Sequence, residues 1–573
     1  METRTASVQL AEIINEEWES RLRYDPVFAT YTGDYRFNDR LQSVTEDDYG
    51  QWLDHLRGLC RRLKALDRTA LTASEQLNVD ILTRLLANEV RDLEFHAYRL
   101  PISKSGGFHL DLTEWLPLIA PFETVKDYEN YVARLAAFRR YVEEQIGVMQ
   151  VGLATGYRPA AVTLAGIDDT LRKQMVTDPA VSPIYAPFNR FPESIGGADR
   201  ERLSTAGRQA LLSSVVPGYE VLLRFLEGEY VPGATAEVGA SRLPDGREFY
   251  QHRIHYFTSL DLSAEQVHDT GQAEVKRIRA EMENAMRAVG FQGEFHAFVE
   301  YLRTDPRFYA ATPEALLKET AYVLKRIDGE LPRLFKTLPR TPYGIRTIPD
   351  ASAPGNTAAY YFPATGDGRC AGFYYVNTFD LASRPLYEIE ALSLHEAVPG
   401  HHLQIALQQE LDMPPFRRFY AFTEFVEGWA LYAERLGLEM GFYQDPYSDF
   451  GRLSYEMWRA CRLVVDTGLH ALGWSRQQAI DFMAANTSST LLNIANEVDR
   501  YIAWPGQALA YKIGELKIRE LRARAERELG SRFDLREFHD LLLGSGAVPL
   551  DLLERMVDRW IAHQGNPQEE TEP

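Results

Sequence analysis

Apolar residues recur every three to four positions along most of the chain, which is the spacing of one face of an amphipathic α-helix. Proline and glycine residues punctuate the joins between these stretches. The expected fold class is therefore mainly α. The pattern predicts helices over residues 6–23, 45–67, 71–96, 124–151, 265–289, 313–337, 385–411, 416–440, 453–473, 475–486, 493–526 and 534–542.

Two short stretches have the aromatic and β-branched composition of strands. They are residues 358–362 and 372–378, and the turn-rich segment 363–369 joins them. This arrangement predicts a small antiparallel hairpin or sheet just before the helix that starts near position 385.

The chain has 573 residues, which exceeds the usual size of one domain. No low-complexity linker or repeat divides it, however. We expect one unit over residues 1–573, with possible lobes 1–340 and 341–573 on either side of a deep cleft.

The most informative motif is His-Glu-Ala-Val-Pro-Gly-His-His at residues 395–402. In the common form His-Glu-x-x-His, two histidines one helical turn apart bind Zn²⁺, and the glutamate is the general base. Position 399, where the second histidine belongs, is a proline here.

Pro399 lacks an N–H and crowds the carbonyl of His395, so the helix must kink or bulge there. If Pro399 and Gly400 are extruded, His401 falls at the position of the second ligand. His402 would lie ~10.5 Å along an unbulged helix, which is too far to share one zinc ion. We therefore favour His395 and His401 as ligands and Glu396 as base, with His402 as the alternative to His401.

A third ligand is expected on the helix over residues 423–434, where three glutamates interrupt an apolar sequence. Carboxylates in such a helix are rarely buried without a partner, and a metal ion would be one. Glu427 is the preferred ligand, and Glu424 is the next candidate and possible support. Solvation or pairing with arginines is the alternative explanation.

Arg462, Asp466 and His470 recur at intervals of four and form one stripe on a predicted helix. Asp466 and His470 are candidates for orienting the metal ligands, since a buried Asp–His pair can hold an imidazole in place. A structural ladder of ion pairs is equally compatible with the spacing.

Residues 499–512 bring together polar side chains around a helix break at Pro505 and Gly506. Hydrolysis of a peptide bond produces an oxyanion that needs a hydrogen-bond donor. Tyr501 and Tyr511 are the candidate donors. Arg500, Gln507 and Lys512 are candidate substrate-binding residues in the same segment.

The strings HEAVPGHH, EGWALYAE, MWRACRLVVDTGLH and WPGQALAYKIGELKI together resemble DUF885, a bacterial family of unknown function, and the resemblance covers residues 10–560. That family resembles the gluzincin metallopeptidases, so the resemblance implies a metal-dependent peptidase. By analogy with gluzincins, the strand 372–378 would be an edge strand that binds peptide, with Tyr374 and Asn377 as contacts.

The net charge of −20 argues against nucleic acid or an anionic membrane surface as a partner. Three widely spaced cysteines and an N-terminus without an apolar segment favour a cytoplasmic protein. The oligomeric state stays open.

Together these features predict a zinc metallopeptidase that acts on short peptides and holds one Zn²⁺ per chain. Two alternatives remain. One is a zinc hydrolase of a non-peptide amide or ester. The other is a non-catalytic peptide-binding protein on a degenerate peptidase scaffold, in which Pro399 has disrupted the zinc-binding motif.

Overall fold

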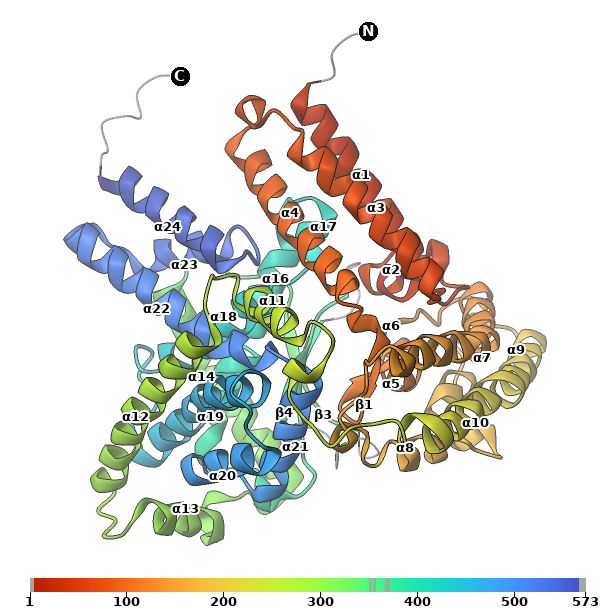
Figure 1. Ribbon diagram of the computed structural model, residues 1–573. Coiled ribbons are helices and arrows are strands. Elements are labelled where there is room, and N and C mark those ends of the chain that lie inside the picture. Colours follow the sequence, from red (N-terminus) through yellow and green to blue (C-terminus); the bar gives the residue numbers. More distant parts are fainter. Residues whose placement is uncertain (1–4, 350–352, 354–356, 366–370, 566–573) are drawn as a thin grey trace. The chain divides into compact units, whose positions relative to one another are not determined.

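The computed structural model describes residues 5–349, 353, 357–365 and 371–565 and is dominated by helices (Figure 1). The mainly α prediction is confirmed. The chain divides into two compact units, Met1–Phe249 and Tyr250–Pro573. This division lies well before position 340, where the sequence suggested a boundary between lobes.

The first unit has a core in which aromatic side chains of its longest helix meet those of a later one, among them Tyr131, Phe138 and Tyr219. Its elements are α1 (Ala6–Tyr24), α2 (Pro26–Thr32), α3 (Glu46–Lys64), α4 (Ala73–Glu94), β1 (Ile102–Ser103), β2 (Gly106–Gly107), α5 (Phe108–Glu114), α6 (Leu116–Ile119), α7 (Val125–Ala154), α8 (Ile167–Gln174), α9 (Gly197–Ala210) and α10 (Val216–Phe225).

Helix α11 (Gly246–Thr258) contains the boundary between the units. The second unit continues with α12 (Ala264–Ala288), α13 (Phe295–Thr304), α14 (Pro313–Leu334), β3 (Tyr343–Thr347), β4 (Ala359–Phe362), β5 (Gly372–Val376), α15 (Ile389–Glu396), α16 (His401–Glu410), α17 (Pro415–Phe419), α18 (Thr423–Leu436), α19 (Pro446–His470), α20 (Arg476–Asn486), α21 (Leu491–Ala503), α22 (Ala510–Leu529), α23 (Leu535–Leu543) and α24 (Leu550–Gly565).

Helix α19 is the central element of the second unit, since nearly every side chain from Phe450 to His470 is buried. It packs along α12, and α18 packs along α22. The second pair is unusually close: a Cβ atom added to Gly428 would lie 2.5 Å from the Cα of Gly514. Two glycines thus let the backbones of α18 and α22 touch.

The predicted hairpin is present, because β4 and β5 pair antiparallel. Residues 366–369 of its connection lie outside the described part of the chain. A third strand, β3, pairs in parallel with β5, and the order is β3-β5-β4. Strand β5 is therefore central, and the prediction of a peptide-binding edge strand at 372–378 is wrong. The edges are β3 and β4.

Three predicted helices are interrupted. Residues 385–411 form α15 and α16, residues 416–440 form α17 and α18, and residues 493–526 form α21 and α22. Proline and glycine lie in the first break (Pro399, Gly400) and in the third (Pro505, Gly506), whereas the break at residues 420–422 contains neither. Among the described residues, no helix combines the length and the apolar character needed to span a bilayer. Cys60 and Cys461 are free thiols, and Cys370 lies outside the described residues.

Candidate metal centre

The turn between α15 and α16 sets the geometry of the candidate site. It spans residues 397–400, and the Val398–Pro399 peptide bond is cis. The N–H of His402 donates to the carbonyl of Ala397 (3.0 Å), which closes the turn. The indole Nε1–H of Trp429 donates to the carbonyl of Pro399 (2.8 Å) and ties the turn to α18.

Gly400 is required in this turn by space. A Cβ atom at this position would overlap the carbonyl oxygens of Leu394 and His395. Because the turn folds back so tightly, the rings of His395 and His401 come to lie 4.8 Å apart and nearly perpendicular. The break that Pro399 predicted thus brings together two histidines that a straight helix would separate.

His395, His401 and Glu427 converge on one point. Glu427 Oε2 lies 3.6 Å from His395 Nε2 and 3.5 Å from His401 Nε2, and the three ligand atoms lie within 4.8 Å of one another. Tetrahedral zinc with ligand distances near 2.05 Å separates its ligand atoms by about 3.3 Å. The observed spacings are close to that value and longer than hydrogen bonds.

The electrostatics of this cluster favour a cation. Glu427 Oε2 is buried and has no hydrogen-bond partner among the described atoms. Burial disfavours the imidazolium of His395, yet Glu427 and Glu434 outweigh it and raise its pKa to about 10. Burial likewise opposes ionisation of Glu427, but the two histidines hold its pKa well below the usual range. A bound metal ion would replace the protons on the histidines and would supply the positive charge that faces Glu427.

Glu434 fixes the orientation of His395. Its Oε1 lies 2.7 Å from His395 Nδ1, and both side chains are buried. A carboxylate accepts, so Nδ1 carries a hydrogen, and a metal ion that replaced the proton on Nε2 would bind the lone pair on the side of Glu427. Metal-bound histidines ordinarily have such a carboxylate behind them.

His402 turns away from the cluster. Its Nδ1 lies 2.9 Å from the hydroxyl of Tyr361, and its other nitrogen hydrogen-bonds the backbone of Thr341. Burial lowers its pKa to about 4. Both ring nitrogens are therefore committed to the neighbouring sheet, and His401 is the member of the pair that faces Glu427.

Glu396 lies beside the cluster at the end of α15 and is partly exposed. Its Oε2 accepts a hydrogen bond from the backbone N–H of Tyr361 in β4 (2.9 Å). The edge strand β4 thus holds the candidate base, and the hydroxyl of the same tyrosine holds His402.

The two candidate oxyanion donors differ in availability. The hydroxyl of Tyr501 is buried and accepts from Arg462 Nε (2.9 Å) and Trp458 Nε1 (3.0 Å), and Glu497 also bonds to it. The Tyr501 hydroxyl has no capacity left for a substrate, so Tyr501 is not a candidate oxyanion donor. The hydroxyl of Tyr511 has no hydrogen-bond partner in the described part of the chain.

The other candidates of the 499–512 segment fall into two groups. Arg500 and Gln507 are partly exposed and hydrogen-bond each other (2.8 Å). They remain candidate substrate-binding residues. Lys512 is fully buried and bonds to Glu456 (2.8 Å) and Glu515 (2.9 Å). An ammonium committed in this way is structural, so Lys512 is not a substrate-binding residue.

Tyr374 and Asn377 are also inaccessible to a substrate. Tyr374 is buried in the central strand, and the Asn377 amide donates to the carbonyls of Ala353 and Thr357, each at 2.9 Å. Asn377 therefore fixes the backbone at Ala353 and Thr357, just before β4. Its expected role in peptide binding is wrong.

Asp466 and His470 do not touch the metal cluster. Asp466 accepts from the Tyr250 hydroxyl (2.6 Å) and from the N–H of Gly506 (3.1 Å), and His470 donates to the carbonyl of Tyr501 (3.0 Å). They anchor the Pro505–Gly506 turn. Glu424 is buried and accepts from the hydroxyl of Ser259, so it serves that contact instead of orienting a ligand.

Glu434 and Tyr361 are the site residues to which the sequence assigned no role. Glu434 carried a usable signal, because it lies seven residues after Glu427 on the same face of an apolar helix. Tyr361 acts through its backbone and through a contact distant in sequence, so no local pattern indicates it.

Comparison with solved structures gives two similar proteins, each named as a candidate lipoprotein. A search of curated proteins finds no match. A candidate lipoprotein from Colwellia psychrerythraea superposes with a TM-score of 0.93 and 28% identity, covering 98% of this chain and 100% of that one. A candidate lipoprotein of unknown function from Shewanella oneidensis shares the fold at a TM-score of 0.71 and 17% identity, covering 96% and 99% of the two chains.

These names give no support to the predicted cytoplasmic location.

The model of a bacterial protein family of unknown function matches residues 26–557. This range includes most of both units and all three candidate metal ligands. The chain belongs to the DUF885 family.

Proposed function

We propose that this protein is a zinc-dependent peptidase of gluzincin type, with His395, His401 and Glu427 holding one Zn²⁺ per chain. The observation that carries the proposal is the spacing of three facing ligand atoms, with Glu427 Oε2 3.5 and 3.6 Å from the two imidazole nitrogens. A bound zinc ion would supply a Lewis acid that acidifies a water molecule and polarises a carbonyl group.

The remaining chemistry falls to side chains beside the cluster. Glu396 is the base that takes a proton from water and returns it to the leaving amine, and the N–H of Tyr361 holds one of its oxygens (2.9 Å). The unengaged hydroxyl of Tyr511 is the candidate donor to the developing oxyanion. A site that only bound ligands would have no need of a glutamate at position 396.

Peptides are the favoured substrate class because an edge strand borders the candidate base. Strand β4 pairs with β5 on one side, and no strand among the described residues pairs with its other side. An extended peptide can add to such an edge through its backbone. Short peptides are favoured because the cluster is deep-set: the side chains of His395, His401 and Glu427 are 4%, 12% and 20% exposed.

The test is turnover of a mixed library of short peptides by zinc-loaded protein, followed by mass spectrometry, with casein as a large substrate. We expect cleavage of short peptides and little digestion of casein. Glu396→Gln should retain zinc and lose activity by about 10²–10⁴-fold, because only proton transfer is removed. Wild-type turnover in this variant would refute the assigned base.

If the protein cleaves no peptide of the library, one of the two other functions is favoured. A zinc hydrolase of a non-peptide amide or ester would still bind metal and hydrolyse activated esters, with the same dependence on Glu396. A peptide-binding protein without catalysis would bind library members and turn over none.

For location we propose a site outside the cytoplasm, since both related structures are named as candidate lipoproteins. Fractionation of the source cells tests this: protein in the envelope or secreted fraction agrees with it, and protein confined to the cytosol contradicts it.

A further inference from the structure

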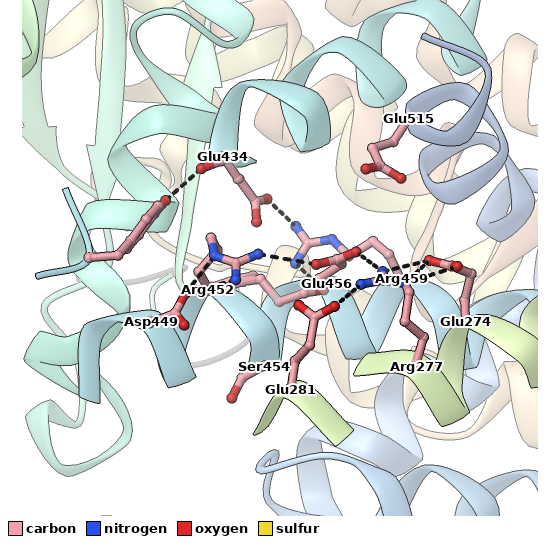
Figure 2. A network of polar contacts seen from close by, with 12 residues as sticks. Glu274, Arg277, Glu281, Glu434, Asp449, Arg452, Ser454, Glu456, Arg459 and Glu515 are labelled. Carbon is pink, nitrogen blue, oxygen red and sulfur yellow. Dashed lines mark hydrogen bonds and ion pairs between the residues drawn. The ribbon is translucent and has the colours of Figure 1, made fainter. Parts of the chain in front are cut away.

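Two buried arginines lie on α19, and the first of them contacts Glu434, the residue that holds His395. Arg459 and Arg462 are one turn apart on α19 and are 5% and 2% exposed. Arg459 Nη2 lies 3.8 Å from Oε1 of Glu434, the same oxygen that accepts from His395. Figure 2 shows Arg459 reaching toward Glu434 at one side of the polar network. A ligand held by Arg459 would therefore lie one side chain away from a metal ligand.

Both guanidinium groups have donors without partners in the described part of the chain. Arg459 Nε is buried and unbonded, and the one hydrogen bond of this side chain is a long contact from Nη1 to the carbonyl of Tyr455 (3.4 Å). Arg462 uses Nε and Nη2 for Tyr501 and Glu497, but its buried Nη1 has no partner. Leaving such donors buried and unpaired is costly.

Arg452, on the same helix, differs because its guanidinium donors have carboxylate partners. Its Nη2 lies 2.7 Å from Asp449, its Nε donates to the same carboxylate at 2.8 Å, and its Nη1 bonds Glu456 at 3.2 Å (Figure 2). Burial on α19 thus does not by itself prevent pairing. Among the three arginines of α19, the buried donors without a partner belong to Arg459 and Arg462.

Local carboxylates do not balance these charges. Glu434 is shared between Arg459 and His395, and Glu497 is shared between Arg462 and Arg500. Burial raises the pKa of Glu388 to about 7 despite the charges of Arg384 and Arg459, so this carboxyl group is only partly ionised near neutral pH. The cluster keeps an excess of positive charge inside the protein.

Aromatic rings shape the space beside these donors. The ring of Tyr511 lies 4.3 Å from the guanidinium carbon of Arg462 and 5.9 Å from that of Arg459, and the ring of Trp458 lies at 4.5 and 4.8 Å. Trp458 is partly exposed. Planar donors held by rings, with a tyrosine hydroxyl nearby, match a planar anion.

We propose that Arg459, Arg462 and Tyr511 form a carboxylate-binding site that anchors the substrate beside the metal centre. The inference rests on the proposed function and narrows its substrate to short peptides that carry a carboxylate. That group is either the C-terminal carboxylate or an acidic side chain, since both present the same two oxygens.

Four peptides separate these sources. They are N-acetyl-Ala-Phe-Gln-Ala and N-acetyl-Ala-Phe-Glu-Ala, each as a free acid and as a C-terminal amide. Calorimetry with zinc-loaded Glu396→Gln protein measures their binding without turnover. We expect one carboxylate to tighten binding by about 10–100-fold, the usual range for a charge-assisted pair. Preference for both free acids identifies the C-terminus, and preference for both Glu peptides identifies the side chain.

Variants assign the effect to the site. Arg459→Gln, made in the Glu396→Gln background, should abolish the preference for the carboxylate while the fully neutral peptide binds within about threefold of the parent. Arg459→Lys should retain part of the preference, because charge is kept and the planar fork is lost. Arg452→Gln removes the same charge from the same helix and should leave the preference intact.

Equal binding of all four peptides would overturn the carboxylate site, as would a preference that survives in Arg459→Gln. Zinc content measured in each variant excludes loss of the metal through Glu434 as the cause. Because the readout is binding, a protein that binds carboxylates but cleaves no peptide would contradict the peptidase and leave this site standing. The reverse outcome would contradict this site alone.

Discussion

At the scale of single residues, the direction of two adjacent imidazoles distinguishes the candidate metal ligand from its neighbour. His401 faces Glu427, whereas His402 is held by Tyr361 and Thr341. We expect His401→Ala to lose bound zinc. His402→Ala should keep zinc and lower the thermal midpoint by several degrees, because a buried, hydrogen-bonded ring is removed. Zinc lost from the His402 variant alone would show that the ligand assignment is off by one residue.

Glu434 should control metal affinity without touching the metal. Its hydrogen bond to His395 Nδ1 (2.7 Å) fixes which nitrogen faces the cluster. We expect Glu434→Gln to weaken zinc binding by about 10–100-fold, which is the usual cost of losing such a partner. Competition with a chelator of known affinity measures this. Glu424→Gln on the same helix is the matched control, and equal affinities in the two variants would contradict the role of Glu434.

His539 should make the second unit sensitive to acid. Its Nδ1–H donates to the carbonyl of Leu334 (2.8 Å), and its Nε2 lies 2.9 Å from the hydroxyl of Tyr432. Burial lowers its pKa from 6.5 to about 3. Below pH 6.5 the unfolded chain therefore takes up a proton that the folded protein refuses, and stability falls as the pH drops toward 3.

The expected loss from this group is at most about 1.4 kcal/mol per pH unit. Denaturant unfolding at pH 7.5 and pH 5.0 measures it. The difference between the two pH values should be smaller in His539→Gln than in the wild type. An identical pH dependence in both proteins would rule out His539 as a contributor.

At the scale of elements, the contact between α18 and α22 carries the site. Gly428 follows the candidate ligand Glu427, and a Cβ there would lie 2.5 Å from the backbone of Gly514. We expect Gly428→Ala to cost about 1–3 kcal/mol of unfolding free energy, as overpacked cores do, and to weaken zinc binding by shifting Glu427.

The control for this variant is Gly329→Ala in α14, where an added Cβ meets nothing within 4 Å. That change should be neutral or stabilising by up to about 1 kcal/mol, because alanine is the better helix former. Denaturant midpoints of the two variants decide the matter. A Gly428 variant as stable as the control would mean that the two helices can separate freely.

Local periodicity predicted most helices of the chain, because amphipathic spacing is a local property. Residues 124–151 and 265–289, for example, correspond to α7 (Val125–Ala154) and α12 (Ala264–Ala288). The break at Pro399 was equally predictable, since proline cannot continue a helix. Strand β3 was not predictable, because its five residues pair with β5 from a distant part of the sequence.

The candidate site was predictable only as far as spacing could carry it. His395, His401 and Glu427 follow from a motif and a helical face. Lys512 and Asn377 were misjudged because their partners, such as Glu456 and Ala353, lie far away in sequence. A polar residue near a motif gives no sign of whether a distant element already satisfies it.

At the scale of the whole molecule, every residue of the candidate metal centre and of the proposed carboxylate site lies in the unit Tyr250–Pro573. The DUF885 match nevertheless begins at residue 26 and includes both units. All residues with a proposed chemical role thus belong to one of the two units that the family match includes.

The central claim is that this unit holds one zinc ion, and elemental analysis of protein never exposed to chelator or nickel resin tests it most directly. We predict about one zinc per chain in the wild type, and near zero in a His395→Ala variant that remains folded by circular dichroism. A wild-type content near zero that dialysis against zinc does not raise would contradict the metal centre and the peptidase built on it.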